Sequence, residues 1–456
     1  MGFKDECGVF GLWPEREASR QTYLGLYALQ HRGQEAAGIC SRDAGVLHLH
    51  KGLGYVADVF SETTLNQLPG DGAIGHTRYS TTGGNVASAA HPFLVEGRFG
   101  QVALCHNGNL TNTEFLRNQL LQAGQVFSSP SDSEVILALI NRASAATLEE
   151  AVMEALRQVE GAYSLLILTS DQLLAVRDPR GFRPLSMALL GAATVFSSES
   201  CAFDLVGAEY LREVEAGEVV IVDAQGTRSR FPRPRLSPTP CVFEHVYFAR
   251  PDSLVYGLSV MATRREMGRI LARRHRVEAD LVVPVPDSGV SAALGYAQES
   301  GIPFEFGLIR NHYVGRTFIE PKQAIRSFGV KIKLNPVREL LKGKRVVLVD
   351  DSVVRGTTSR KIVQMVRAAG AAEVHLRISS PPTTHSCFYG IDTPSRDQLL
   401  ASNLDVEGIR AFIGADSIGY LTLEDLQASV QDRTGEGFCY ACFTGAYPEP
   451  PEGDRR

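Results

Sequence analysis

Two continuous aliphatic runs in the second half of the chain place the strongest limit on its fold. Asp280–Pro284 and Arg345–Asp350 are each followed by a polar, glycine-containing turn and then by a helical pattern. Strands that are buried on both faces have this composition, because helices cover both sides of a parallel sheet. The two runs therefore predict a doubly wound α/β domain, in which ligands bind beyond the carboxyl ends of the strands.

The first half of the chain follows a different pattern. Short strand-like runs are separated by turn residues, and two helical segments, Thr113–Gln122 and Leu148–Gln158, lie among them. This alternation suits a layered domain that is rich in sheet. The strand-like runs are Gly72–His76, Gln101–His106, Ser164–Thr169, Gln172–Arg177 and Glu218–Val222.

A stretch rich in proline and arginine, residues 226–240, separates the two patterns. Its four prolines lack amide donors and disfavour regular structure. We therefore expect a first domain over residues 7–235 and a second over residues 236–446. The mixed charge and prolines of residues 447–456 predict a disordered tail.

The composition excludes several classes of protein. Of 456 residues, 44% are hydrophobic and 21% are charged, which is typical of folded, soluble chains. The net charge of −5 gives no general attraction to nucleic acid. No apolar run approaches the roughly 18–20 residues of a membrane helix, and residues 1–6 are too short and acidic for a signal peptide. We therefore expect a cytoplasmic protein that binds neither nucleic acid nor membrane.

Cys7 is the first candidate for chemistry. A lone cysteine at the start of a strand is most simply a buried core residue. If residues 1–6 were removed, however, Cys7 would carry a free α-amine with a pKa of about 8, which is a base beside its own thiol. The nucleophile and its base would then share one residue.

Three further segments offer what an amide-cleaving cysteine needs. Arg78 can hold a substrate carboxylate through two hydrogen bonds. Asn107 and Gly108 can donate to an oxyanion, and Asp132 can bind a substrate ammonium. Each signal alone is weak, because Asn-Gly is common in hairpin turns and the Ser-x-x-Glu spacing around Asp132 is common in helix capping boxes. Together they fit glutamine, which presents a carboxylate, an ammonium and a carboxamide.

The motifs Cys7–Gly11 and His31–Glu35, with Arg78 and the Asn107-Gly108 pair, carry a family resemblance. The first half of the chain resembles the N-terminal-nucleophile glutamine amidotransferases. This resemblance implies a four-layer αββα sandwich, in which glutamine is hydrolysed through a thioester on Cys7. It also implies that residues 1–6 are a cleaved leader.

The second domain carries a candidate phosphate site. The strand Arg345–Asp350 ends in the acid pair Asp350-Asp351, and a Gly/Thr turn then opens a helix to about Ala369. Backbone N–H groups and hydroxyls at a helix N-terminus bind phosphate, and adjacent carboxylates hold sugar hydroxyls or bound magnesium. The alternative is an acidic strand end followed by an ordinary capped helix. The residues of the turn are Arg355, Gly356, Thr357 and Thr358.

This strand, acid pair and loop resemble the type I phosphoribosyltransferases, which use 5-phosphoribosyl 1-pyrophosphate (PRPP). The resemblance assigns Asp350 and Asp351 to the ribose and its Mg²⁺, and the turn at 355–358 to the 5′-phosphate. It makes Val283–Gly289 a pyrophosphate loop, with Asp287 on the substrate and Ser288 near the magnesium. Residues 310–326 resemble the family's mobile lid, although a plain surface loop has the same composition.

An amide-cleaving domain joined to a PRPP domain narrows the resemblance to the glutamine-dependent PRPP amidotransferases. The motifs Arg177–Pro184, Ser198–Ser200 and Phe243–Asp252 also resemble that family. The resemblance implies that glutamine, PRPP and water give 5-phosphoribosylamine, glutamate and pyrophosphate, the first committed step of purine (IMP) biosynthesis. It further implies feedback inhibition by purine nucleotides and a homotetramer.

Four of the eight cysteines are candidate metal ligands. Cys439 and Cys442 form a C-x-x-C pair, and Cys241 and Cys387 could complete a tetrahedral set. Spacing alone admits either zinc or an iron–sulfur cluster. One branch of the resembled family places a 4Fe–4S cluster on cysteines at these four positions, and the same branch has the cleaved leader.

Two other functions would account for part of this sequence pattern. A PRPP-binding regulator without catalysis would share the second domain, but no DNA-binding module is evident in the sequence. Amidotransferases of the glucosamine-phosphate or asparagine synthase type would share only the first half. Their sugar-isomerase or ATP-binding halves are not visible, whereas the PRPP motif is present.

Overall fold

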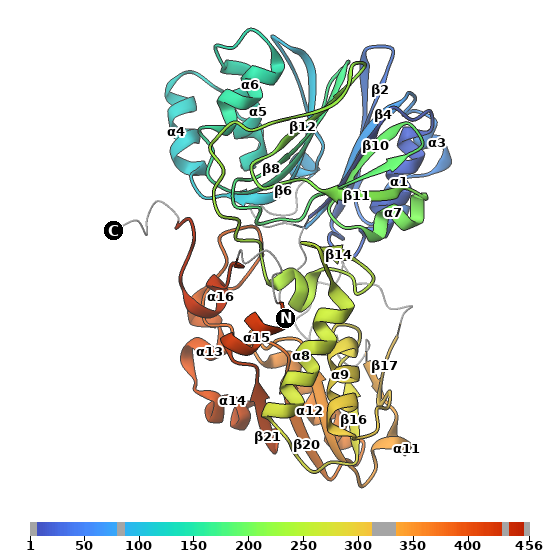
Figure 1. Cartoon of the computed structure of the whole chain (residues 1–456), viewed down its shortest axis with the longest axis vertical. Coiled ribbons are helices and arrows are strands. Elements are labelled where there is room, and N and C mark those ends of the chain that lie inside the picture. The colour runs from blue at the N-terminus through green and yellow to red at the C-terminus, as the bar shows by residue number, and fades with distance from the viewer. Residues whose placement is uncertain (1–6, 80–86, 312–333, 431–436, 451–456) are drawn as a thin grey trace.

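The computed structural model describes residues 7–79, 87–311, 334–430 and 437–450. Two antiparallel sheets face each other in the first domain, in the upper half of Figure 1. The first sheet has the order β11 (Glu209–Glu213), β9 (Ser186–Leu190), β10 (Ala193–Ser197), β1 (Gly8–Trp13), β4 (Gly72–Arg78), β2 (Ala36–Asp43) and β3 (Val46–Leu53). The second has the order β13 (Gly226–Arg230), β12 (Val219–Asp223), β8 (Gln172–Arg177), β7 (Gly161–Leu168), β6 (Gly100–Leu110) and β5 (Phe93–Gly97).

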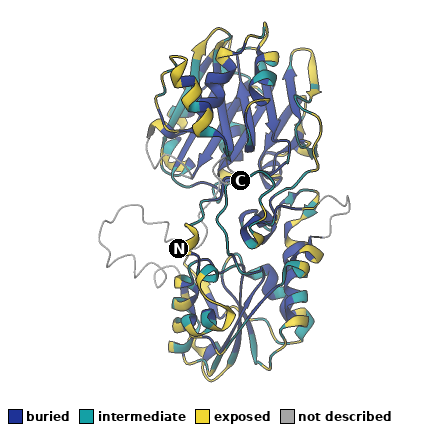
Figure 2. Cartoon of the chain, turned by 90° about the vertical axis from the view of Figure 1, so that its left-hand side faces the viewer, coloured by how far each residue is buried: buried dark blue, intermediate teal, exposed yellow. Residues whose placement is uncertain are grey.

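Helices cover the outer face of each sheet, so the domain has four layers (Figure 1). Between the sheets lies an apolar layer that includes Val9, Ile74 and Leu166. Because both faces are covered, every residue of β1 and β7 is buried (Figure 2). The expected αββα sandwich is confirmed. The covering helices are α1 (Ala18–Ala28), α2 (Val56–Val59), α3 (Glu62–Leu65) and α7 (Cys201–Val206) on one side, and α4 (Thr113–Gln122), α5 (Asp132–Arg142) and α6 (Leu148–Leu156) on the other.

The second domain is built on four parallel strands in the order β16 (Leu281–Pro284), β19 (Arg345–Asp350), β20 (Glu373–Ile378) and β21 (Ser417–Tyr420). Alternate residues of β19 enter different cores: Val347 and Val349 pack with α8 and α9, whereas Val346 and Leu348 pack with α12 and α14. Helices on both faces confirm the expected doubly wound domain. The helices are α8 (Val260–Arg274), α9 (Val290–Ser300), α12 (Thr357–Ala368), α14 (Val406–Ile413) and α15 (Leu423–Ser429).

Short elements connect these layers. They are η1 (Ala87–Ala89), the π-helix η2 (Glu244–Phe248), β14 (Leu254–Val255), β15 (Leu258–Ser259), β17 (Leu308–Arg310), β18 (Leu334–Pro336), α11 (Arg338–Leu341), η3 (Arg396–Gln398), α13 (Leu400–Asn403) and α16 (Ala441–Thr444).

The segment after β13 stays on the first domain. Arg157 Nε donates to the carbonyl of Pro232 at 3.1 Å, and Thr239 N donates to the carbonyl of Arg180 at 2.7 Å. The chain therefore enters the second domain only after residue 240, a few residues beyond the boundary expected from composition.

Part of the C-terminal segment is held in place, which differs from the expected disordered tail. The hydroxyl of Tyr447 donates to the carbonyl of Ser386 at 2.6 Å. The carboxylate of Glu449 accepts the N–H of Gly161 at 3.0 Å, so this segment returns to the first domain. Residues 451–456, like the leader at 1–6, lie outside the described residues.

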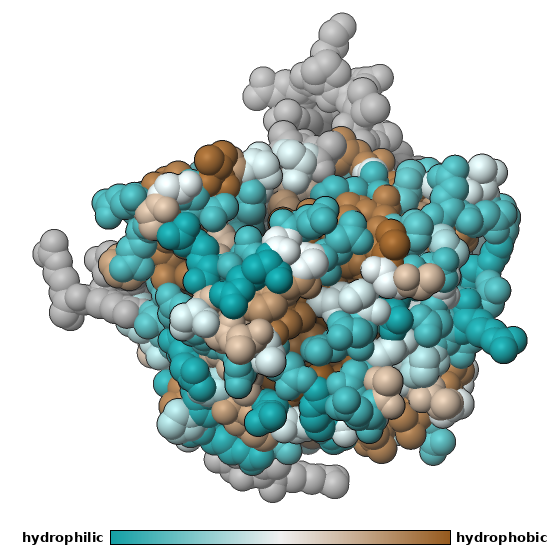
Figure 3. Space-filling model, turned by 90° about the horizontal axis from the view of Figure 1, so that it is seen from above, coloured by the Kyte–Doolittle hydropathy of each residue, from teal (hydrophilic) through white to brown (hydrophobic). Residues whose placement is uncertain are grey.

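Within the described ranges, no helix is long and apolar enough to cross a membrane. Seen from above, the end of the first domain mixes hydrophilic and hydrophobic side chains over its surface (Figure 3).

Two candidate active sites

Cys7 lies where the first sheet begins. Gly8 pairs with Thr77 of β4, so Cys7 adjoins the end of β4 that carries Arg78. The side chain of Cys7 is buried, and its Sγ lies 3.6 Å from the carbonyl of Tyr79, to which the thiol can donate. On the other side, Arg32 Nε donates to the carbonyl of Cys7 at 3.0 Å. The predicted nucleophile is therefore fixed beside the predicted carboxylate-binding arginine.

The predicted oxyanion donors lie within a strand of the second sheet. Asn107 and Gly108 belong to β6, so this Asn-Gly pair forms no hairpin turn. Asn107 is 1% exposed, and its Nδ2 has no hydrogen-bond partner among the described residues. A buried donor without a partner is costly unless a ligand accepts from it. Gly108 has φ +147°, and a Cβ there would lie 2.1 Å from the carbonyl oxygen of Ala162, so only glycine fits.

A hydrogen bond between the sheets brings these groups together. His76 of β4 lies two residues before Arg78, and its Nε2 is 2.9 Å from the carbonyl of His106 on β6. Burial lowers the pKa of His76 to about 3, so the ring is neutral and Nε2–H donates. The bond joins the strand that carries Arg78 to the strand that carries Asn107.

Asp132, the first residue of α5, faces the same region. Its Oδ2 accepts the N–H of Leu110 at 3.1 Å, and its Oδ1 lies 3.4 Å from His106 Nδ1. Burial alone would raise the pKa of Asp132, but His106 and two backbone N–H groups outweigh it and hold the pKa below its usual value. Asp132 is thus a buried carboxylate that stays ionised, as an ammonium-binding group must.

The Ser-x-x-Glu spacing around Asp132 is not a capping box. Ser131 caps α5 by accepting the N–H of Ser133. Glu134 instead accepts the N–H groups of Ser128 and Ser129, at 2.7 and 2.8 Å. Glu134 therefore fixes the turn before the helix.

A second candidate site lies at the carboxyl end of β19. Asp350 and Asp351 are both buried there. Burial raises the pKa of both, and the charge of Asp351 raises that of Asp350 further. A hydrogen bond from the side chain of Ser288 opposes the rise at Asp351. Two adjacent buried carboxylates with a hydroxyl offer the hard oxygen ligands that Mg²⁺ prefers, so these residues fit the expected ion.

The predicted pyrophosphate loop borders this acid pair. Val285 N donates to the carbonyl of Val349 at 2.8 Å, which holds the loop along the end of β19. Asp287 is exposed and forms an ion pair with Arg310. The rest of the predicted lid, residues 312–326, lies outside the described residues.

The predicted phosphate turn opens α12 directly after the acid pair. Gly356 is the N-cap in the left-handed region, with φ +69°, and a Cβ there would lie 2.4 Å from Leu400 Cδ2. Since glycine has no capping side chain, the first turn, with Thr357 and Thr358, presents backbone N–H groups to a ligand. Arg355 adds a cation at the same turn. These four residues form a cradle suited to a phosphate.

Backbone contacts gather the four candidate ligand cysteines. Cys439 N donates to the carbonyl of Pro240, and the N–H groups of Thr384 and His385 both donate to the carbonyl of Cys442. Burial and then the thiols of Cys241, Cys439 and Cys387 raise the pKa of Cys442, which places all four near one another. In the described parts of the chain, however, no group of three or more His, Cys, Asp or Glu residues is arranged to hold a metal ion.

Comparison with known proteins finds relatives of both domains. A family described as "Glutamine amidotransferase domain" matches residues 76–204, and "Phosphoribosyl transferase domain" matches residues 259–379. Amidophosphoribosyltransferase 1, chloroplastic, of Arabidopsis thaliana is 52% identical over 450 residues, 98% of this chain and 79% of the relative. Amidophosphoribosyltransferase of Bacillus subtilis is 49% identical over 98% of this chain and 95% of its own length. The chain belongs to the amidophosphoribosyltransferase family.

Solved structures of this family share the whole architecture. The glutamine PRPP amidotransferase of B. subtilis, in complex with ADP and GMP, aligns with a TM-score of 0.93 and 49% identity over 98% of both chains. A structure described as the allosteric regulatory enzyme of purine biosynthesis aligns with a TM-score of 0.94 and covers 98% of this chain and 97% of its own. The amidotransferase and phosphoribosyltransferase halves therefore follow each other here as they do in those family members.

One ionic cluster between the two halves was not foreseen. Arg32 donates to Glu199 at 2.6 Å and to Glu244 at 2.8 and 2.9 Å, and all three side chains are fully buried. His31 Nε2 lies 2.7 Å from Glu199. Burial would raise the pKa of Glu199, but His31 and Arg32 outweigh it and hold the pKa well below its usual range. Each residue lies in a motif noted in the sequence, but nothing local indicates that positions so far apart would meet.

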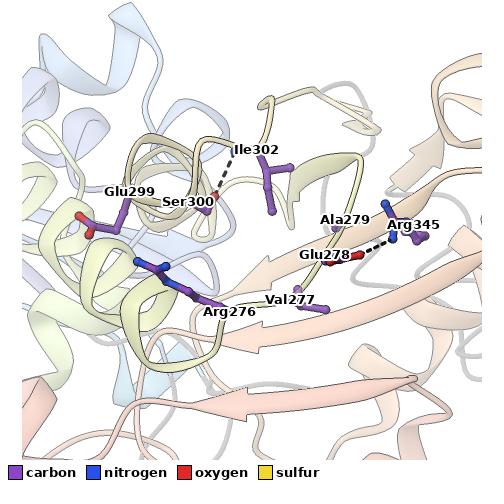
Figure 4. A pocket seen from close by; sticks show the side chains of 8 residues that line it. All are labelled: Arg276, Val277, Glu278, Ala279, Glu299, Ser300, Ile302 and Arg345. Atoms are coloured by element: carbon purple, nitrogen blue, oxygen red, sulfur yellow. Dashed lines mark hydrogen bonds and ion pairs between the residues drawn. The ribbon is translucent and has the colours of Figure 1, made fainter.

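A cavity of about 460 Å³ lies at the opposite end of the parallel sheet, before β16 and β19 (Figure 4). Glu278 and Arg345 on its wall form an ion pair at 3.4 Å. It contains none of the predicted site residues. Its lining consists of Arg276, Val277, Glu278, Ala279, Glu299, Ser300, Ile302 and Arg345.

Proposed function

We propose that this member of the family converts glutamine, PRPP and water into 5-phosphoribosylamine, glutamate and pyrophosphate. The supporting observation is that one chain combines a buried cysteine, an Asn107 Nδ2 group without a partner among the described residues and an ionised Asp132 with a buried acid pair beside a phosphate cradle. The relatives that match nearly the full chain carry the name of this activity.

In the glutaminase step, Arg78 and Asp132 hold the carboxylate and ammonium of glutamine. With residues 1–6 removed, the α-amine of Cys7 takes the thiol proton while sulfur attacks the carboxamide carbon. Asn107 and Gly108 donate to the resulting oxyanion. Collapse of this intermediate expels ammonia, which leaves with the transferred proton, and water then hydrolyses the thioester to glutamate.

In the transfer step, ammonia attacks carbon 1 of PRPP and pyrophosphate leaves. Asp350 and Asp351 orient the ribose, and the 355–358 turn anchors the 5′-phosphate. The acid pair, with Ser288, would hold Mg²⁺, whose charge, when it is bound, stabilises the departing pyrophosphate. Asp287 borders the pyrophosphate from the exposed side of its loop.

We also propose that Cys241, Cys387, Cys439 and Cys442 hold a 4Fe–4S cluster. Such a cluster binds each thiolate through a different iron, so the sulfurs lie farther apart than the ligands of a single ion. The support is that backbone contacts and the mutual influence of the thiols on the pKa of Cys442 bring the four cysteines near one another. Iron and sulfide analysis of protein purified without oxygen tests the assignment, with Cys442→Ser as the variant and Cys40→Ser, in the first-domain core, as its control. We expect about four irons per chain in the wild type and in Cys40→Ser, and loss of the iron in Cys442→Ser. Zinc in stoichiometric amount in place of iron would overturn the assignment.

Regulation by purine nucleotides and a homotetrameric assembly complete the proposal. The B. subtilis relative was solved with ADP and GMP, and another structural relative is described as allosteric and regulatory. We expect ADP and GMP to inhibit this enzyme. We expect sedimentation equilibrium to report four chains per particle, and a monomer would contradict the assembly.

The deciding experiment measures glutamate release from glutamine with and without magnesium and PRPP, on protein whose leader status is checked by intact mass. PRPP-stimulated glutamate with matching pyrophosphate is expected. Cys7→Ser should abolish the glutamine-dependent reaction and leave the ammonia-dependent reaction, because only the first site is altered. Glutamate release indifferent to PRPP would contradict the coupling. No release from processed, cluster-loaded protein would favour a PRPP-binding regulator.

A further inference from the structure

A segment of the second domain lies directly against the oxyanion strand of the first. Asn109 Nδ2, one residue beyond Gly108, donates to the carbonyl of Phe388 at 3.0 Å. Gly390 approaches even more closely: a Cβ on it would lie 3.0 Å from both Cα and the carbonyl carbon of Gly108, and 3.3 Å from its oxygen. The backbone of Gly108 is thus enclosed between Ala162 of β7 and Gly390.

The first domain also fixes the segment Phe388–Gly390 from a second direction. Arg183, which is fully buried, donates from Nε to the carbonyl of Tyr389 at 2.8 Å. The ring of Phe182 stacks on the ring of Tyr389, with centroids 4.1 Å apart and planes 13° apart. The position of the segment relative to β6 is therefore set by hydrogen bonds and stacking as well as by contact with Gly108.

On its far side the segment is tied to the cysteine region. Tyr389 N donates to Cys387 Sγ at 3.3 Å, and Cys387 N donates to Thr393 Oγ1 at 2.7 Å. Gly390 itself has φ +104°, a conformation that residues with a side chain rarely adopt. A glycine is required at this position both by its backbone and by the closeness of Gly108.

We propose that Phe388–Gly390 is a positioning element for the glutaminase reaction, through which the phosphoribosyltransferase half holds Gly108 and Asn107 in the geometry that stabilises the oxyanion. The inference rests on the oxyanion role assigned above to this pair. Stabilisation of an oxyanion requires donors at hydrogen-bond distance from a point fixed in space, and misplacement by about 1 Å can cost about 100-fold in rate. The atoms nearest to an added Cβ on Gly390 all belong to Gly108, so the proposal places its effect on the oxyanion donors and not on the groups assigned to glutamine binding.

Gly390→Ala tests this element in the full-length, cluster-loaded enzyme. The added methyl must push the Gly108 backbone by several tenths of an ångström, so we expect kcat for glutamine hydrolysis to fall about 10-fold to 100-fold. KM for glutamine should stay within about twofold, and ammonia-dependent synthesis should stay at the wild-type rate, because the acid pair and the phosphate cradle are untouched.

Gly226→Ala is the matched control. Gly226 has a similar φ of +112° and no atom within 4 Å of an added Cβ, so it shares the backbone strain without the contact. It should leave kcat unchanged. Asn109→Ala gives an independent variant that removes the hydrogen bond to Phe388, together with a longer one from the same amide to the carbonyl of Leu110 at 3.3 Å, with an expected fall in kcat of about threefold to tenfold. The falls in kcat caused by Asn109→Ala and by Gly390→Ala should not multiply in the double variant, because both substitutions act on the same contact.

The outcomes separate this inference from the function on which it rests. If wild type releases glutamate in response to PRPP but Gly390→Ala and Asn109→Ala keep wild-type kcat, the positioning element is refuted and the function stands. A loss of ammonia-dependent synthesis or of iron in the Gly390→Ala protein would also overturn it, since the effect would then be a general disturbance of the second domain. An inactive wild type would instead refute the proposed function.

Discussion

Replacing Arg32 by methionine should destabilise the first domain strongly. The substitution removes a guanidinium that bonds both Glu199 and Glu244, and leaves two fully buried carboxylates with less countercharge. Removing one partner of a buried ion pair lowers the free energy of unfolding by about 3–5 kcal/mol, because the remaining charge stays buried. With a urea dependence of about 3 kcal/mol per molar for a domain of this size, the unfolding midpoint should fall by about 1–1.7 M.

The chain provides its own probe for this measurement. Trp13 is its one tryptophan and is buried at the end of β1, so its fluorescence reports the unfolding of the first domain alone. Arg20→Met is the matched control, because Arg20 pairs with Glu62 on the exposed surface. An exposed pair of this kind contributes little, so the control midpoint should move little or not at all.

The effect of pH gives a second check on the same reasoning. In the wild type the folded pKa of Glu199 lies below its unfolded value of about 4.3, so its stabilising contribution is present above that pH and is lost as pH falls through the folded pKa. In Arg32→Met the folded pKa of Glu199 rises, so protonation relieves the buried charge. The difference in urea midpoint between the wild type and Arg32→Met should therefore be smaller near pH 5 than near pH 8. A shift below about 0.3 M, or a deficit independent of pH, would refute a buried, charge-paired Arg32.

Three further predictions follow from the two sites. Asn107→Ala should lower kcat with glutamine by about 100-fold to 1000-fold and spare the ammonia-dependent rate in a steady-state assay, and an equal loss in both would contradict its role as an oxyanion donor. Asp350→Asn should lower the glutamine-dependent and the ammonia-dependent rates together, and pyrophosphate release would measure both. His76→Gln should flatten the loss of stability in acid. Wild-type His76 has a folded pKa of about 3 against about 6.5 in the unfolded chain, so the free energy of unfolding falls by up to about 1.4 kcal/mol for each pH unit below about 6.5. An unchanged pH slope of the Trp13 transition would argue against a neutral, buried His76.

Local patterns in the sequence predicted the elements whose structure depends on local chemistry. The helix over Thr113–Gln122 and the strand over Arg345–Asp350 have the bounds expected from their apolar spacing and turn residues. The Gly/Thr turn after the acid pair likewise opens a helix, as its composition indicates. In these segments, side-chain periodicity and glycine placement are compatible with few other secondary structures.

Long-range contacts limited the prediction elsewhere. The composition of residues 447–456 is that of a mobile tail, yet Tyr447 and Glu449 are held by partners distant in the sequence. The Asn107-Gly108 pair is a frequent turn signal, but pairing with β7 places it inside a strand. The ion cluster of Arg32 and the contact between Gly390 and Gly108 depend on how two domains dock, which no local pattern encodes. Tertiary packing overrides local preference wherever burial supplies the larger free energy.

The chain crosses between its halves twice. It leaves the first domain where Cys241 N donates to the carbonyl of Phe182, and it returns where Gly161 N donates to Glu449. Between these crossings the buried Arg32–Glu244 ion pair and the hydrogen bonds from Asn109 and Arg183 to the Phe388–Gly390 segment join the same two halves. A rigid body attached at several points that do not share one line has no axis left to turn about, so one half can swing against the other only if some of these contacts break.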